Sequence, residues 1–185
     1  MKYNHIIFLD VDGVLNNTNY TCKIYDKKGK DYYYKIVDKD FALFDPKSLK
    51  YIRRLIKYFE DDILLVISST WRRNDDAFNK VIEKITKNRY IFSLPVDKTL
   101  VRPDNIRGLE IRDYLEKHNL QYTNFVIIDD DVADIIHPEV PDYSRNFVKC
   151  NYMDGFKRNE YKRALKILRG DLVERYIPES NTRDL

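Results

Sequence analysis

Two aspartates stand two residues apart at the end of an apolar run near the N-terminus. The run is Ile6 to Leu9, and Asp10-Val11-Asp12-Gly13 follows it directly. In a strand, residues i and i+2 point to the same side, so both carboxylates can face one ligand. Such a pair is solvated, bound to a metal ion or engaged in catalysis, and the rest of the sequence has to decide among these.

Two further apolar runs end in the same way. Ile63 to Ile67 ends at Ser68-Ser69, and Phe125 to Ile128 ends at Asp129-Asp130-Asp131. None of the three runs alternates polar and apolar residues, which is expected of strands buried on both faces of a parallel sheet. Because ligands of open α/β sheets bind beyond the carboxyl ends of the strands, the polar residues that follow the runs are the candidate site residues.

Two groups of carboxylates that meet at one sheet edge repel each other. A divalent cation with oxygen ligands removes this repulsion, and Mg²⁺ suits a site of a few carboxylates with water and phosphate oxygens. Each acidic cluster taken alone can also be a solvated loop. Their joint placement after three apolar runs favours the metal site, so the sequence predicts Mg²⁺ as a cofactor.

Helical patterns separate the apolar runs. Asp45 and Asn74 are predicted N-caps of two helices, and apolar residues recur at helical spacing after each of them. Two more helices are expected over about 108–118 and 159–176. Strands that alternate with helices predict a Rossmann-like, doubly wound α/β fold, and a chain of 185 residues can bury one sizeable core. We therefore expect a single domain over residues 1–177, followed by a frayed tail over 178–185.

The segment of residues 20–40 departs from this alternation. Lys23 to Tyr25 and Tyr32 to Val37 flank a polar turn that contains Gly29, and this pattern predicts a β-hairpin flap over the carboxyl edge of the sheet. Its tyrosines and lysines can form an aromatic and basic surface over the site. Alternatively, half of the tyrosines pack against the domain, as alternation in a strand requires.

Composition excludes several classes of protein. The 33 basic and 30 acidic residues give a net charge of +3, which indicates no surface that strongly attracts polyanions. Cys22 and Cys150 are far apart, so neither a disulfide framework nor a zinc site is expected, and a reducing cytoplasm is the default location. No apolar run approaches the 18 residues of a membrane span. No obligate protein partner is evident.

The first motif resembles a known one. Asp10-Val11-Asp12-Gly13-Val14-Leu15 after an apolar strand is similar to the DxDG[TV]L motif of the haloacid dehalogenase (HAD) superfamily. Ser68 at the end of the second apolar run, a basic residue at the start of a later helix and the acidic cluster near residue 130 continue this resemblance, which covers roughly residues 5–135 in order and spacing. Within that superfamily, four segments resemble the small HAD domain of nucleic-acid repair proteins. The four segments are SSTWR from Ser68, RGLEIRDYLEKHN from Arg107, IIDDD from Ile127 and DGF from Asp154.

The resemblance implies a role for each matching residue. Asp10 would be the nucleophile that forms an aspartyl-phosphate, and Asp12 would be the general acid and base. Gly13 would let the backbone turn sharply where the strand ends. Ser68, with Ser69 beside it, would bind phosphoryl oxygens.

The resemblance also implies the metal ligands. Mg²⁺ would be held by the Asp10 carboxylate, the Asp12 backbone carbonyl and Asp130, with Asp129 as the second choice for the last position. Asp131 and Asp134 are expected to support these ligands or to face solvent.

The basic residue of the third motif departs from the usual lysine. Arg107 is the best match by position, with Lys98 and Arg102 as alternatives, and an arginine can neutralise a phosphoryl group through two hydrogen bonds. Arg72 either contacts substrate phosphate or is solvated. Trp71 either stacks on a base or packs against the edge of the sheet.

The resulting hypothesis is a Mg²⁺-dependent phosphomonoester hydrolase that works through an aspartyl-phosphate. With the hairpin as its only cap, the site would be open and would act on nucleic-acid ends or nucleotides, a preference that rests on analogy of fold. Two alternatives remain open: a phosphatase of small metabolites and a non-catalytic HAD-like binding domain.

Overall fold

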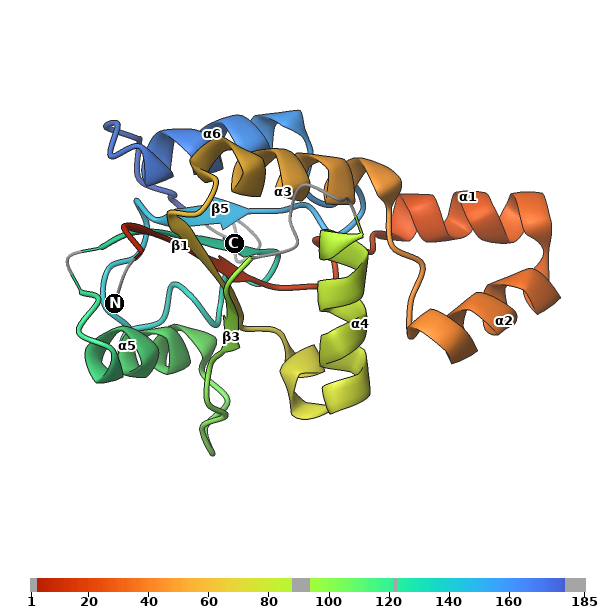
Figure 1. The fold of residues 1–185 in the computed structure, drawn as a ribbon, viewed down its shortest axis with the longest axis horizontal. Helices are drawn as coiled ribbons and strands as arrows, with labels where there is room; N and C mark the ends of the chain where they lie inside the picture. Colours follow the sequence, from red (N-terminus) through yellow and green to blue (C-terminus); the bar gives the residue numbers. More distant parts are fainter. Residues whose placement is uncertain (1–2, 88–93, 122, 179–185) are drawn as a thin grey trace, which may run out of the picture.

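A parallel sheet forms the centre of the domain (Figure 1). The computed structural model describes residues 3–87, 94–121 and 123–178, and within them five strands pair in the order β3-β2-β1-β4-β5, all parallel. The strands are β1 (His5–Leu9), β2 (Ile63–Ile67), β3 (Val96–Lys98), β4 (Asn124–Asp129) and β5 (Phe147–Lys149). This confirms the α/β fold and the three predicted strands. The edge strands β3 and β5 have three residues each, too few for an apolar run to reveal them.

Helices cover both faces of this sheet (Figure 1). The helices α3 (Pro46–Phe59), α4 (Asp75–Thr86) and α6 (Arg158–Leu168) lie on one face, and α5 (Arg107–Lys117) lies on the other. The central strands are buried on both sides as predicted: in β1, Ile7 and Leu9 join the core under α3, whereas Ile6 and Phe8 join the core under α5. This two-sided burial explains why β1 carries no polar residue between Ile6 and Leu9.

The helix boundaries follow local capping signals. Asp45 accepts a hydrogen bond from the Lys47 backbone N–H at 2.9 Å, and Asn74 accepts one from Ala77 N–H at 2.9 Å. Both predicted N-caps are thus confirmed. The predicted helix over 159–176 is too long, because α6 ends at Leu168 and Leu172 beyond it is 90 % exposed.

The predicted β-hairpin over residues 20–40 is wrong. The segment forms two helices, α1 (Thr18–Lys28) and α2 (Lys30–Asp40), and it does not form a flap over the sheet. Asn17 caps the first helix by accepting a hydrogen bond from Tyr20 N–H at 2.9 Å. The many lysines of this segment favour a helix over a strand, and they outweigh the β-propensity of its tyrosines.

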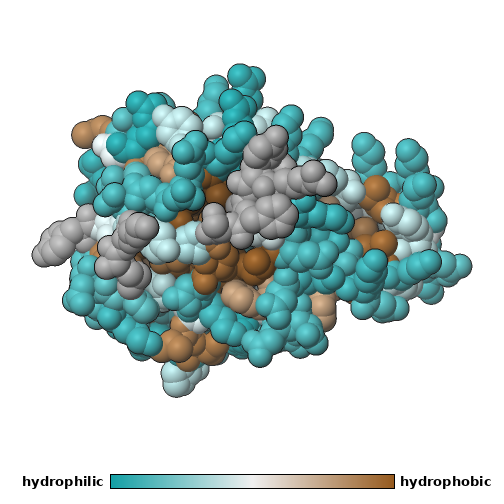
Figure 2. Space-filling model, in the orientation of Figure 1, coloured by the Kyte–Doolittle hydropathy of each residue, from teal (hydrophilic) through white to brown (hydrophobic). Residues whose placement is uncertain are grey.

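The pair of helices α1 and α2 projects from one end of the domain (Figure 1). Its surface is mostly hydrophilic, with a few hydrophobic side chains, on the face drawn in Figure 2. The end of α2 is tied to α4, since Asp40 forms ion pairs with Lys84 at 2.6 Å and Lys80 at 3.5 Å. The pair is therefore fixed to the core at its base and extends beside the sheet rather than over it.

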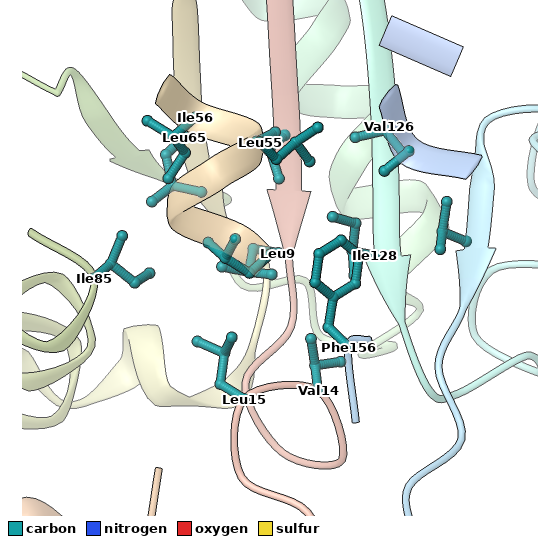
Figure 3. Packing of buried hydrophobic residues seen from close by; sticks show 14 of the residues in the cluster. Leu9, Val14, Leu15, Leu55, Ile56, Leu65, Ile85, Val126, Ile128 and Phe156 are labelled. Carbon is teal, nitrogen blue, oxygen red and sulfur yellow. The ribbon is translucent and has the colours of Figure 1, made fainter. Parts of the chain in front are cut away.

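The loop after β1 is anchored in the core by the DGF segment. Phe156 is fully buried, its backbone N–H donates to Val14 O at 2.9 Å, and its ring lies with Val14 and Ile128 in the core cluster (Figure 3). Asp154 accepts a hydrogen bond from Asn19 at 3.0 Å. The motif thus holds the loop that carries Asp12.

Of the predicted tail over 178–185, only Pro178 lies within the described residues. Among those residues, no helix has the length and hydropathy that a membrane-spanning segment needs.

Candidate active site

The three predicted clusters meet at the carboxyl edge of the sheet. Asp10 N–H donates to Ile128 O at 3.0 Å, and Ser68 N–H donates to Leu9 O at 3.0 Å. These bonds extend the ladders on both sides of β1 by one residue. The ends of β2, β1 and β4 therefore lie in register, and their polar residues face a common space.

Three carboxylates gather there closely enough to hold one cation. Oxygens of Asp10, Asp129 and Asp130 all lie within 4.8 Å of one another. Asp10 and Asp129 are buried, and Asp130 is partly buried. Carboxylate oxygens are the ligands that Mg²⁺ prefers, so the donor set fits the ion that the sequence predicts.

Burial and mutual repulsion raise the pKa values of this cluster. Burial, followed by the negative charge of Asp129, raises the pKa of Asp10 well above its usual value, although Arg107 opposes the change. Burial also raises the pKa of Asp129 to about 6 and, with the charge of Asp131, raises the pKa of Asp130. A bound divalent cation would stabilise the ionised carboxylates, so metal binding is expected to release protons.

Arg107 supplies the positive charge at this cluster. Its guanidinium donates to Asp129 and lies 3.1 Å from Asp10 Oδ1. The two alternatives for the third motif bind elsewhere: Lys98 pairs with Asp75 at 2.9 Å, and Arg102 pairs with Asp104 at 2.8 Å. Among the described residues the structure thus brings Arg107, rather than either alternative, to the predicted nucleophile.

Two glycines allow this close packing. Gly13 has φ +66°, which agrees with the predicted sharp turn, and a Cβ atom there would lie 2.3 Å from Asp130 Oδ2. Gly108 follows Arg107 and donates from its backbone to Asp134 O at 2.9 Å. A Cβ atom at Gly108 would meet Val140 at 2.5 Å. Hence a side chain at Gly13 would displace Asp130, and one at Gly108 would displace Val140 beside the start of α5.

Two buried hydroxyls point to an anion-binding role. Ser68 Oγ and Ser69 Oγ are both buried: Ser68 Oγ has no hydrogen-bond partner among the described residues, and Ser69 Oγ lies close enough to Asp10 to lower the pKa of that carboxyl. A buried polar group without a partner costs about 1–3 kcal/mol, so an unpaired hydroxyl calls for a ligand or an ordered water. A phosphoryl oxygen would be such a ligand for Ser68.

Asp12 lies beside the cluster and is held separately. Its Oδ1 accepts a hydrogen bond from Asn16 Nδ2 at 2.7 Å, and its Oδ2 accepts one from Trp71 Nε1 at 2.9 Å. The residue lines a cavity of about 330 Å³ with Tyr33 and Phe41. Asp12 thus borders the space between the core and the α1–α2 pair.

One comparison with known proteins, the match to a family model, agrees with this geometry. A family described as the HAD domain in Swiss Army Knife RNA repair proteins matches residues 6–161. The chain belongs to this family. No curated protein and no solved structure matches the chain.

In this HAD domain Arg72 is buried rather than solvated. Its guanidinium forms an ion pair with Glu110, and it donates to Ser68 O at 2.7 Å, to Ser69 O at 2.7 Å and to Thr99 O at 3.1 Å. The predicted contact of Arg72 with phosphate stays a prediction. The contacts in the structure favour a positioning role, because they fix the backbone that carries both serines.

Two residues near the site of this HAD domain, Asn16 and Glu110, are not among those predicted from the sequence. Asn16 follows the first motif as one of two asparagines, and nothing in the local pattern links it to Asp12. The position of Glu110 in the sequence could have predicted its burial. It stands between Leu109 and Ile111 on the inner face of α5, where a charged side chain requires a buried partner.

Proposed function

We propose that the protein is a Mg²⁺-dependent phosphomonoesterase that acts through an aspartyl-phosphate on Asp10. The observation that carries this proposal is the convergence of three carboxylates, one arginine and two buried hydroxyls at the carboxyl edge of the sheet. The carboxylates are suited to bind a divalent cation, and the arginine and the hydroxyls are suited to bind a dianionic phosphate beside it. HAD domains are typically phosphohydrolases, which supports the same reading.

The proposed reaction has two steps. The Asp10 carboxylate attacks phosphorus, the ester P–O bond breaks, and Asp12 donates a proton to the departing oxygen. Asp12 then removes a proton from a water molecule, which attacks phosphorus, releases inorganic phosphate and restores Asp10. Ser68, Ser69 and Arg107 are proposed to hold the non-bridging oxygens.

The carboxylates proposed to hold the metal ion are those of Asp10, Asp129 and Asp130. The backbone carbonyl of Asp12 is a proposed further ligand. When bound, Mg²⁺ supplies positive charge that offsets the charge of the transferring phosphoryl group. The same charge lets Asp10 remain ionised as a nucleophile.

The proposed substrates are the phosphorylated ends of nucleic acids, or nucleotides. The family description names RNA repair proteins. In addition, Tyr32 and Tyr34 are 42 % and 50 % exposed on α2, each with a lysine ammonium about 6 Å from its ring. Exposed rings can stack on bases while lysines contact phosphates. Because the α1–α2 pair extends beside the sheet rather than over it, we propose that the site admits the end of a polymer.

Hydrolysis of p-nitrophenyl phosphate tests the reaction. The wild type should release p-nitrophenol with Mg²⁺ and lose this activity in EDTA, and Asp10→Asn should abolish it, because an amide is not a nucleophile toward phosphorus. Asp61→Asn, which changes a surface carboxylate, serves as the control. A wild type without Mg²⁺-dependent turnover would contradict the enzyme function and favour a binding domain.

A substrate panel tests the second part of the proposal. Oligonucleotides with a 3′- or 5′-phosphate are compared with mononucleotides and sugar phosphates at equal concentration. A kcat/KM for one oligonucleotide end above that for every small phosphate would support the nucleic-acid assignment. Preference for a sugar phosphate would favour the small-metabolite alternative instead.

A further inference from the structure

The carboxylate of Asp12 is held on both of its oxygens, although the residue is exposed. Asn16 Nδ2 donates to Oδ1 at 2.7 Å, and Trp71 Nε1 donates to Oδ2 at 2.9 Å. An exposed aspartate otherwise samples several rotamers. Two donors from different segments, the loop after β1 and the 3₁₀ turn η1 (Thr70–Arg73), restrict it to one.

The indole that makes one of these bonds is itself fixed by packing. Phe44 lies edge-on to the Trp71 ring with 5.5 Å between the ring centroids, and Phe41 lies edge-on at 6.1 Å. Both phenylalanines belong to the segment that joins α2 to α3. Edge-on contacts of this kind set the plane of a ring, and the plane of the indole sets the direction of its N–H.

We propose that Trp71 is a positioning residue for the acid–base step: its N–H, together with Asn16, aims the Asp12 carboxylate at the oxygen that leaves phosphorus. This inference rests on the proposed phosphatase function. A carboxylate has about four lone-pair sites, so two donors leave room for the transferred proton. The sequence alternatives for Trp71 were stacking on a base or packing at the sheet edge, and the structure adds the bond to Asp12.

The role predicts a specific dependence on the leaving group. A p-nitrophenolate ion departs without a proton, whereas the more basic phenolate needs one. Trp71→Phe keeps an aromatic ring between Phe41 and Phe44 and removes the N–H. The two esters, p-nitrophenyl phosphate and phenyl phosphate, differ only by the para-nitro group, and each loss is measured relative to the wild type on the same ester, so differences in binding between the esters cancel.

We expect Trp71→Phe to lower kcat/KM for phenyl phosphate by about tenfold, a part of the roughly 10²–10⁴-fold that a general acid contributes. For p-nitrophenyl phosphate the loss should stay below about threefold. The ratio kcat/KM is used because it reports the steps up to release of the alcohol, before Asp12 acts on water. Equal losses on both esters, or none, would overturn the proposal.

An NMR measurement tests the hydrogen bond between Trp71 and Asp12 independently of enzymatic activity. The chain has one tryptophan, so the ¹H–¹⁵N spectrum contains one indole N–H signal. In the wild type this proton should resonate downfield, as a proton bonded to a carboxylate does, and it should move upfield in Asp12→Asn. Asp75→Asn is the matched control, since Asp75 pairs with Lys98 and is 84 % exposed.

The two experiments separate the possible failures. A wild type that cleaves neither ester contradicts the proposed function, and the indole signal then decides the Trp71–Asp12 bond alone. A signal that does not change between the wild type and Asp12→Asn overturns the positioning role, whatever the enzyme does.

Discussion

Arg107 Nη1 lies 3.1 Å from Asp10 Oδ1, and the same nitrogen donates to Asp129. One guanidinium thus joins the proposed nucleophile on β1 to a proposed metal ligand at the end of β4. It offsets part of the repulsion in a cluster that otherwise holds only negative charge. Three basic residues fit the third motif by sequence, and this contact distinguishes them.

Replacing Arg107 should impair phosphoryl transfer far more than replacing its alternatives. We expect Arg107→Gln to lower kcat/KM by about 10²–10³-fold, the usual cost of removing one group that stabilises the transition state. Arg102→Gln is the control, because Arg102 pairs with Asp104 and Asp113 away from the cluster. Steady-state kinetics on p-nitrophenyl phosphate measures both. Similar losses in the two variants would contradict the assignment of Arg107.

Gly13→Ala should weaken metal binding in addition to straining the backbone. A Cβ atom at Gly13 would meet Asp130 Oδ2 at 2.3 Å, so the carboxylate has to move out of the cluster. Gly170→Ala is the control: its φ is also positive, at +73°, but the nearest atom is 3.7 Å away. Both variants should lose about 1–2 kcal/mol of stability from strain.

Mg²⁺ titration by calorimetry distinguishes these two glycine variants. Gly13→Ala should bind Mg²⁺ at least about tenfold more weakly than Gly170→Ala, and Asp130→Asn should show a loss in the same direction. Wild-type affinity in both Gly13→Ala and Asp130→Asn would mean that Asp130 is not a metal ligand.

The buried pair of Arg72 and Glu110 should behave as a structural unit. Arg72→Met leaves the Glu110 carboxylate buried without its partner, so we expect a loss of about 3–5 kcal/mol in the free energy of unfolding. The double change Arg72→Met with Glu110→Met removes both charges and should cost less than the sum of the single changes. Urea unfolding of the four proteins measures the coupling. Strict additivity would contradict the pair.

Asp45 should make the fold sensitive to acid. Burial raises the pKa of Asp45, but hydrogen bonds from Lys157, Lys47 N–H and Asn17 together lower it by more than burial raises it. The net pKa of Asp45 therefore lies below its usual value. A carboxyl with a lowered folded pKa stabilises the fold above its unfolded pKa, near 4, and this stabilisation is lost as pH falls through the folded pKa.

Asp45→Asn tests this dependence, because asparagine caps a helix as well as aspartate does. At pH 7 the variant should be about 1 kcal/mol less stable than the wild type. The difference should shrink steadily below pH 4, as measured by urea unfolding across pH. Asp75→Asn, at an exposed carboxylate, should stay within about 0.5 kcal/mol at every pH. A difference at Asp45 that is independent of pH would contradict the charge pairing with Lys157.

Prediction from sequence succeeded where the signal is local. The three apolar runs correspond to β1, β2 and β4. They are recognisable in the sequence because the residues of a strand that is buried on both faces must all be apolar. Asp45 and Asn74 cap helices because each satisfies an N–H within three residues of itself. The prediction for residues 20–40 was wrong because the tyrosines of this segment favour a strand and its lysines favour a helix. The periodicity of hydrophobic residues alone does not resolve such a conflict.

The sequence by itself determined the α/β class, the order of the site segments and the set of candidate aspartates and serines, since these depend on pattern along the chain. Only the tertiary structure decided that Arg107 rather than Lys98 or Arg102 reaches Asp10, that Arg72 pairs with Glu110 inside the core, and that Trp71 bonds to Asp12. Each of these contacts joins residues more than 30 positions apart. Such contacts depend on how the strands and helices pack, and spacing along the chain does not contain that information.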